Sequence, residues 1–243
     1  MQWMKFMRRH ESNIFNAFFF DNENITEEDL NAIISDIARF FDLPIPVIND
    51  RCEEMARIIM GENARDTELF YNIEMLKNAG INNKDAFTLC FVHEMAHQML
   101  YTERFNLFRN ERWMQELAAD LTAGIYASLH LLSTGKFKYA LSTQKPSLTH
   151  PDGKLREMVV DYGRIEFEKN RDVKCKMVNR VRNLIPAFFY IHCRQMKNDW
   201  KQVAHDLEYP PQPVPQKEIR IEDLPESNLI KQAIQKYNKQ KGL

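Results

Sequence analysis

The pentapeptide His93-Glu94-Met95-Ala96-His97 restricts the fold of this 243-residue chain more than any other feature. It ends an apolar run that begins at Ala86, which predicts a buried helix. At about 3.6 residues per turn, His93 and His97 project from one helical face, and their imidazoles can reach a single zinc ion. Glu94 lies beside them, where it can act on a water next to that ion. The pentapeptide therefore predicts two metal ligands and requires a third from elsewhere.

A second predicted helix offers that third ligand. It places Glu116 and Asp120 at positions i and i+4, on one face. Glu116 follows His97 by 19 residues, a gap that fits a helix end, a loop and a return helix. A cysteine or a distant histidine could also ligate the metal, but Glu116 is the better candidate. Asp120 is then expected to accept a hydrogen bond from the outer N–H of a ligand histidine and to fix its tautomer.

Small residues recur along the same helix. Ala119, Ala123 and Ala127 follow one another at four-residue spacing, with Gly124 beside them. Small side chains let two helix backbones approach closely, and a glutamate on a neighbouring helix needs that proximity to reach the metal. The pattern therefore predicts close helix packing around the site.

The motifs together resemble a family of zinc peptidases. HExxH followed by an ExxxD helix is the gluzincin pattern, and residues 116–120 resemble the E-x-x-A-D motif of the family that includes the HtpX heat-shock protease and the CAAX prenyl proteases. That family also has a T-H-P segment followed by an arginine. Here Thr149-His150-Pro151 precedes Arg156, so the three motifs span about 65 residues. The membrane-spanning helices of those proteases are missing, and a soluble relative is expected.

The resemblance implies a zinc-dependent endopeptidase that acts on a protein or peptide substrate. Glu94 is then the general base, and His150 or Arg156 would bind the substrate or hold the oxyanion. Zincins generally bind substrate as an extended strand along a sheet edge beside the metal helix. Residues 67–76 are the candidate edge.

Two other interpretations stay open. Residues 87–92, before HExxH, also resemble ImmA-type peptidases, which cleave repressors in mobile elements, and phage-exclusion proteases; the ImmA pattern lacks the segment 149–151. The chain could instead be a non-catalytic zinc-binding module whose helical C-terminal half binds a protein partner. Glu94 argues against this second alternative, because structural zinc needs no general base.

Composition excludes several partners and compartments. The formal net charge of −1 gives no reason to expect nucleic acid or an acidic membrane surface as the main partner. The four cysteines are widely spaced, as in free thiols of a reducing compartment. No run approaches the about 18–20 apolar residues that span a bilayer, and the short apolar stretch 14–20 lacks a cleavage site. We therefore expect a cytoplasmic protein.

Periodicity and turn residues predict an α+β, predominantly helical fold with a minimal zincin-like core, in which a small sheet accompanies the HExxH and ExxxD helices. The predicted helices are 27–41, 85–101, 111–133, 153–168 and 172–206, the last interrupted before Pro186. The predicted non-helical segments are an extended 43–48, a strand in the first half of 67–76, and turns over 136–150. Residues 52–60 fit helix or strand equally.

The same features predict three parts of the chain. Residues 1–168 are expected to form the metallopeptidase domain, with its core at about 27–168. Residues 169–209 form a helical extension packed on that domain. Residues 210–243 are a proline-rich linker followed by a terminal amphipathic helix. The oligomeric state is not encoded in any of these patterns.

Overall fold

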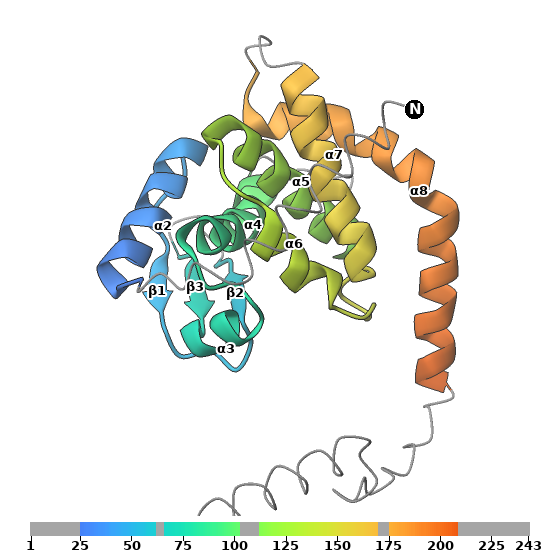
Figure 1. Cartoon of the computed structure of the whole chain (residues 1–243), viewed down its shortest axis with the longest axis horizontal. Coiled ribbons are helices and arrows are strands. Elements are labelled where there is room, and N and C mark those ends of the chain that lie inside the picture. Colours follow the sequence, from blue (N-terminus) through green and yellow to red (C-terminus); the bar gives the residue numbers. More distant parts are fainter. Residues whose placement is uncertain (1–24, 62–65, 103–111, 170–174, 209–243) are drawn as a thin grey trace, which may run out of the picture. The chain divides into compact units, whose positions relative to one another are not determined.

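A computed structural model of the chain describes residues 25–61, 66–102, 112–169 and 175–208 (Figure 1). The predicted linker and terminal helix of residues 210–243, the apolar stretch 14–20 and the residues between the two predicted helices, 103–111, lie outside these ranges. Contacts divide the chain into two units, Met1–Ala204 and His205–Leu243. The elements described below belong to the first unit, apart from the last residues of the final helix.

The described residues are predominantly helical, with one small sheet, as the sequence predicts. The helices are α2 (Glu27–Phe41), α3 (Ile73–Asn78), α4 (Lys84–Thr102), α5 (Arg112–His130), α6 (Gly135–Ser142), α7 (Gly153–Lys169) and α8 (Met177–Glu208). The strands are β1 (Val47–Asn49), β2 (Ala56–Ile59) and β3 (Glu68–Tyr71). Within the described ranges, none of the helices combines the length and apolar character that a bilayer-spanning segment needs.

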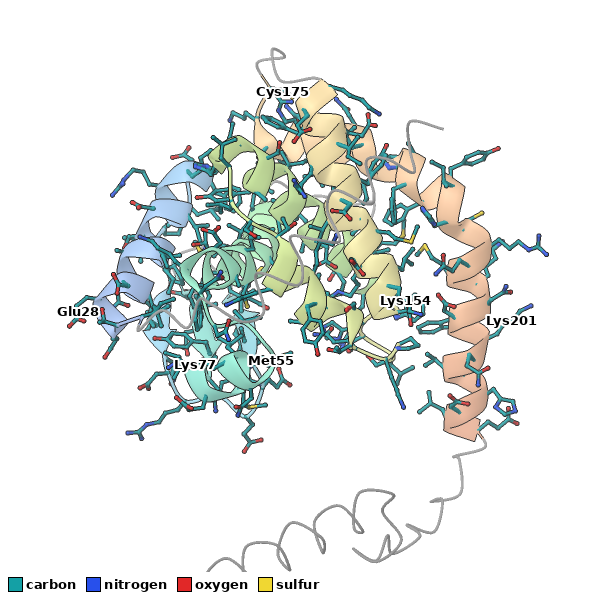
Figure 2. The ribbon with its side chains drawn as sticks, in the orientation of Figure 1. Glu28, Met55, Lys77, Lys154, Cys175 and Lys201 are labelled. Carbon is teal, nitrogen blue, oxygen red and sulfur yellow. The ribbon has the colours of Figure 1, made fainter. Side chains whose placement is uncertain are left out.

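The helix α2 follows from local sequence. Thr26 and Asp29 form a capping box, in which each side chain bonds to the backbone N–H of the other residue. Leu30, Ile34 and Ile37 recur at helical spacing and are almost completely buried. The opposite face is solvated, and Glu28 projects outward there (Figure 2). The predicted range 27–41 is therefore confirmed.

The sheet corrects one prediction. Its strand order is β1-β3-β2, with β1 parallel and β2 antiparallel to β3. Because β3 is paired on both sides, residues 67–76 cannot offer the free edge that the sequence suggested. Leu69 and Tyr71 are both buried, and their alternation indicates a strand. The same pattern does not show that this strand is the central one. Among the described residues, β2 is the edge strand that lies against α4, and it places Ala56–Ile59 of the ambiguous segment 52–60 in a strand.

Helix α4 is the central element and packs against α2, α5, α6 and β2. Phe87, Phe91 and Met95 are fully buried, as expected of a helix with apolar residues on most of its faces. The polar side chains of HExxH thus emerge from a rigid, water-excluding helix.

Two helical segments differ from the prediction. Residues 135–142 form α6, although turns were expected over 136–150, because Phe137, Ala140 and Leu141 bury one helical face. Turns occupy only the segment that follows it. Helix α8 continues through Pro186 without the predicted interruption. Pro186 is exposed, while Ile185 and Phe188 are buried on either side of it, and their packing holds the helix through the missing hydrogen bond.

Two glycines, Gly124 and Gly163, lie where helices α5 and α7 are in close contact. A Cβ on Gly124 would lie 2.1 Å from the carbonyl oxygen of Val160, and one on Gly163 would lie 2.6 Å from that of Leu121. Neither contact leaves room for a side chain. Gly124 of α5 and Gly163 of α7 therefore allow the two helices to pack closely, and that packing supports the helix that carries Glu116.

Gly124→Ala is expected to lower the free energy of unfolding by about 1–3 kcal/mol, because the new methyl would collide with backbone atoms of α7. Replacing glycine by alanine in a helix without such a contact would instead raise the free energy of unfolding by up to about 1 kcal/mol. A decrease in the free energy of unfolding therefore indicates the α5–α7 contact. Urea unfolding measures it. The matched control is Glu168→Ala on the exposed face of α7, which should change the value by less than about 0.5 kcal/mol.

Candidate metal centre

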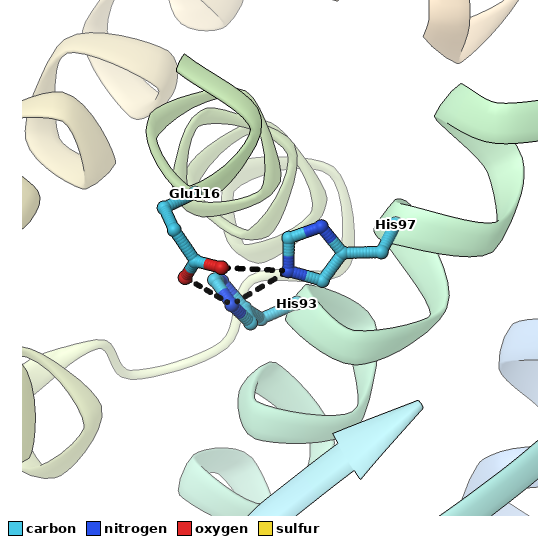
Figure 3. A group of neighbouring side chains, drawn as sticks. All are labelled: His93, His97 and Glu116. Atoms are coloured by element: carbon cyan, nitrogen blue, oxygen red, sulfur yellow. Dashed lines mark hydrogen bonds and ion pairs between the residues drawn. The ribbon is translucent and has the colours of Figure 1, made fainter. Parts of the chain in front are cut away.

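The two histidines of HExxH lie one turn apart on α4 and point to the same space (Figure 3). Their Nε2 atoms are 3.2 Å apart, and their rings meet edge to face. His93 is buried and His97 half-buried. Helix geometry alone thus brings the two predicted ligand nitrogens together.

Glu116 reaches the same space from α5 (Figure 3). Its Oε2 lies 3.3 Å from His93 Nε2, and its Oε1 lies 3.5 Å from His97 Nε2. Zinc ligands at about 2.0–2.1 Å in tetrahedral geometry are separated by about 3.3 Å. The two nitrogens are 3.2 Å apart, and two different oxygens of Glu116 lie 3.3 and 3.5 Å from them, distances close to that value. His93, His97 and Glu116 therefore form a group that could hold a metal ion.

The Glu116 carboxylate is electrostatically prepared for a cation. Its Oε2 is buried and, among the described residues, meets no hydrogen-bond donor in suitable geometry. Burial alone would raise the pKa of Glu116, but His97, His93 and Arg156 hold it well below its usual range. Nitrogens of His93, His150 and Arg156 lie 3.3–3.4 Å from this oxygen without hydrogen-bond geometry, and a metal ion would add the direct contact that it lacks. The residues present thus fit a divalent metal such as zinc.

Asp120, one turn beyond Glu116, lies against the outer nitrogen of His93. Its Oδ1 is 2.8 Å from His93 Nδ1, and the carboxylate is fully buried. This contact leaves Nε2 of His93 to face the metal position, the arrangement that a ligand histidine with an outer carboxylate partner adopts. The sequence predicted this role for Asp120 without identifying which histidine it contacts.

The two histidines differ in charge. Burial lowers the pKa of His97 to about 4, so its Nε2 lone pair is available to a cation. Burial also acts to lower the pKa of His93, but Asp120 and Glu116 outweigh it and raise the pKa to about 10. In the metal-free protein His93 therefore holds a proton that an incoming metal ion has to displace.

Arg156 lies behind the ligands. Its Nε and Nη2 donate to the two oxygens of Asp120, at 2.7 and 3.1 Å, and its Nη1 donates to Gln144 at 2.6 Å. Nη2 is also 3.4 Å from Glu116 Oε2. The side chain is only 4% exposed, so its donors are already engaged and turned away from solvent. This geometry favours a role in positioning Glu116 and Asp120 over the substrate or oxyanion contact predicted for Arg156.

Glu94 sits beside the metal position on α4, facing the sheet. Burial is the main cause that raises the pKa of its carboxyl to about 7; His93 and Arg156 act to lower this pKa, and the Glu116 carboxylate acts to raise it. The carboxylate also accepts a hydrogen bond from the backbone N–H of Ile58 in β2. A carboxylate with a pKa near neutrality can both take up and release a proton.

His150 is brought to the site by the loop between α6 and α7. Its Nε2 lies 3.4 Å from Glu116 Oε2, and its side chain is 44% exposed. Burial lowers the pKa of the imidazole, which favours its neutral form. Unlike Arg156, His150 combines proximity to the metal position with access from solvent.

Three further residues support the site and were not predicted. Gln144 accepts from Arg156, Ser147 holds the turn of His150, and Trp113 donates its indole N–H to the Ser147 carbonyl oxygen at 2.8 Å. Trp113 also meets Trp200 of α8 edge to face. These contacts join residues far apart in sequence, and neither spacing nor residue type signals them.

Among the described residues, no cysteine and no further histidine joins the metal-ligand group. The four cysteines are free thiols, as predicted. His130 stacks on Tyr126, and His192 packs on Phe188.

Comparison with protein-family models, with curated proteins and with solved structures finds no match. The inference of function therefore depends on the residues of the site.

Proposed function

We propose that the protein is a zinc-dependent endopeptidase with a zincin-like core. The observation that carries this proposal is the convergence of His93, His97 and Glu116: the two Nε2 atoms are 3.2 Å apart and the two carboxylate oxygens lie 3.3 and 3.5 Å from them, close to the spacing of tetrahedral zinc ligands. Three protein ligands leave a fourth position open, the arrangement of catalytic and not of structural zinc. Glu94 beside that position gives the group a proton acceptor, which a structural site would not need.

When bound, zinc supplies a Lewis acid that activates a water molecule and polarises a peptide carbonyl. Glu94 then acts as general base, accepting a proton from the attacking water and delivering it to the leaving amine. Its pKa of about 7 suits both transfers. Asp120 and Arg156 keep the His93 imidazole and the Glu116 carboxylate in place, and they need not touch the substrate.

The free edge of β2 is the best candidate for the substrate strand. The N–H of Asn72 donates to Met55, so in this antiparallel pair Arg57 also faces β3, while Ala56 and Ile58 face outward. The outward N–H of Ile58 bonds to Glu94. Because this N–H is engaged, a substrate peptide would pair in extended form with the other outward groups of β2, those of Ala56 and the carbonyl oxygen of Ile58, and would lie beside the general base. Main-chain pairing would bind unstructured segments with little sequence preference.

Removal and return of the metal test the proposal. The parent protein is expected to lose hydrolysis of an unstructured protein such as casein after chelation, and to regain it with one equivalent of zinc, since the ligand group holds one ion. Zinc should also raise the melting temperature, because it binds the folded site. Metal content and casein hydrolysis are measured on the same samples. A protein that takes up no zinc would overturn the ligand assignment, whereas bound zinc without hydrolysis would indicate a non-catalytic module.

A further inference from the structure

Arg57 is an exposed basic residue on the strand that lies beside the general base. It belongs to β2, at one edge of the sheet that the described residues form (Figure 1). Side chains alternate between the two faces of a strand. Ala56 and Ile58 pack against the core, whereas Arg57 and Ile59 are exposed on the other face. The Arg57 side chain therefore stands on the face of the sheet turned away from the core, next to any strand that pairs with β2.

The guanidinium of Arg57 has only a weak partner. Its Cζ lies 5.1 Å from the centroid of the Phe70 ring on β3, the strand next to β2. Cation–π contacts of this kind are weak at exposed sites. Within the described ranges no carboxylate forms an ion pair with Arg57, and Glu68, on the same face of β3, is opposite Ile59. Because a guanidinium presents several N–H donors, Arg57 can bind a further acceptor.

The hydrogen bonds of β2 place Arg57 where a neighbouring side chain comes closest. The N–H of Asn72 donates to the carbonyl oxygen of Met55, and in this antiparallel register the N–H and C=O of Arg57 also face β3. A strand on the outer side of β2 therefore meets Arg57 as a non-hydrogen-bonded pair. In antiparallel sheets, the more stable of the two pairings, such pairs bring their side chains closer than hydrogen-bonded pairs do. One substrate side chain would thus lie directly against Arg57.

The position opposite Arg57 favours an acidic substrate side chain. Opposite charges at directly opposed positions stabilise a strand pair, and like charges destabilise it. Since the guanidinium leans over Phe70, away from the outer edge of β2, the longer glutamate reaches it better than aspartate. The next residue, Ile58, donates its N–H to Glu94. The substrate residue opposite Arg57 therefore keeps a fixed offset from the bond beside the general base.

We propose that Arg57 is a specificity-determining residue, which selects substrates that place a glutamate opposite it when they pair in antiparallel direction with the outer edge of β2. Main-chain pairing by itself sets little sequence preference, and Arg57 adds a preference for negative charge at one position. The cleavage part of this inference rests on the proposed peptidase function. The binding of an acidic strand to β2 does not require hydrolysis.

A charge exchange at Arg57 tests the assignment. The zinc-loaded parent, Arg57→Lys and Arg57→Glu each digest the same mixture of unstructured peptides, and mass spectrometry of the fragments identifies the residues around every cut. In the parent, glutamate should be enriched by about 1.5- to fivefold at one fixed offset, the effect of one cross-strand charge pair. Arg57→Lys should keep this preference. Arg57→Glu should replace it with a preference for lysine or arginine at the same offset, a gain that misfolding cannot produce.

The matched control is Arg39→Glu, which reverses the same charge on the exposed surface of α2, where Arg39 pairs with Asp36. Its cleavage pattern should equal that of the parent. Absence of a glutamate preference in the parent, or its persistence in Arg57→Glu, would overturn the role of Arg57. An equal change in Arg39→Glu would also overturn it, because the preference would then follow the net charge of the protein and not the position in the strand.

Peptide binding separates this inference from the peptidase function. Labelled peptides that differ only in having Glu, Gln or Lys at alternate positions are titrated into the Glu94→Gln protein with and without Arg57→Glu, and fluorescence anisotropy gives the affinities. The Glu peptide should bind more tightly than the Lys peptide, and Arg57→Glu should reverse this order. Equal or unmeasurable affinities would overturn the inference. A zinc-loaded parent that cuts no peptide would refute the peptidase proposal, while the order of the affinities would still decide the role of Arg57.

Discussion

The Glu94→Gln protein is expected to hydrolyse an unstructured protein about 10²- to 10⁴-fold more slowly than the parent, with its zinc retained. Glutamine preserves the size of the side chain and an oxygen that accepts from the Ile58 N–H, but it cannot take up a proton at neutral pH. The ligand side chains of His93, His97 and Glu116 are untouched. The loss should therefore appear in kcat, because the missing group acts on the reacting water.

Zinc content and initial rates, measured on the same preparations, separate this result from misfolding. Parent and Glu94→Gln should each hold one equivalent of zinc and melt within a few degrees of one another. Equal rates for the two proteins would remove Glu94 from the mechanism. A trapped substrate, recovered with the slow variant and absent from the Glu116→Ala control, would in addition identify the natural target.

The core of the candidate site could be predicted because its geometry is mostly local. His93 and His97 face one direction by helical spacing alone, and Asp120 accompanies Glu116 for the same reason. The step from one helix to the other was an inference from a 19-residue gap, and the structure places Glu116 within 3.5 Å of both histidines. Helical spacing therefore predicts the relation of His93 to His97 and of Glu116 to Asp120, whereas the approach of the two helices had to be inferred.

What the sequence could not supply depends on partners distant in the chain. Residues 67–76 carry a strand pattern, yet only the pairing of β1 and β2 on either side makes β3 central. Arg156 was visible as a charged residue after a T-H-P segment, but its burial against Asp120, 36 positions earlier, decides its role. Trp113 bonds to Ser147 across 34 positions. No single-residue pattern encodes such contacts, because they arise when packed helices bring separate segments together.

Glu116→Ala is expected to weaken zinc binding by more than about a hundredfold, beyond the about 10- to 100-fold that loss of an outer partner costs. The two histidines would remain, but a pair of neutral nitrogens lacks the carboxylate charge that neutralises the metal. The rise in melting temperature caused by zinc should accordingly disappear at concentrations that stabilise the parent. The rise is measured between the zinc-loaded and the zinc-free form of the same variant. Loss of the Arg156–Glu116 contact lowers the stability of both forms, so it does not affect the difference.

Calorimetric titration of zinc into the metal-free proteins measures the affinity directly. Glu157→Ala is the matched control, because that glutamate lies on α7, pairs with Lys138 and does not reach the centre. Its zinc affinity should equal that of the parent. Tight zinc binding by Glu116→Ala would mean that the third ligand comes from another group, and the observed spacing of the His93, His97 and Glu116 atoms would then reflect ion pairing alone. Loss of binding in Glu116→Ala, with the control unaffected, assigns the carboxylate of α5 to the metal.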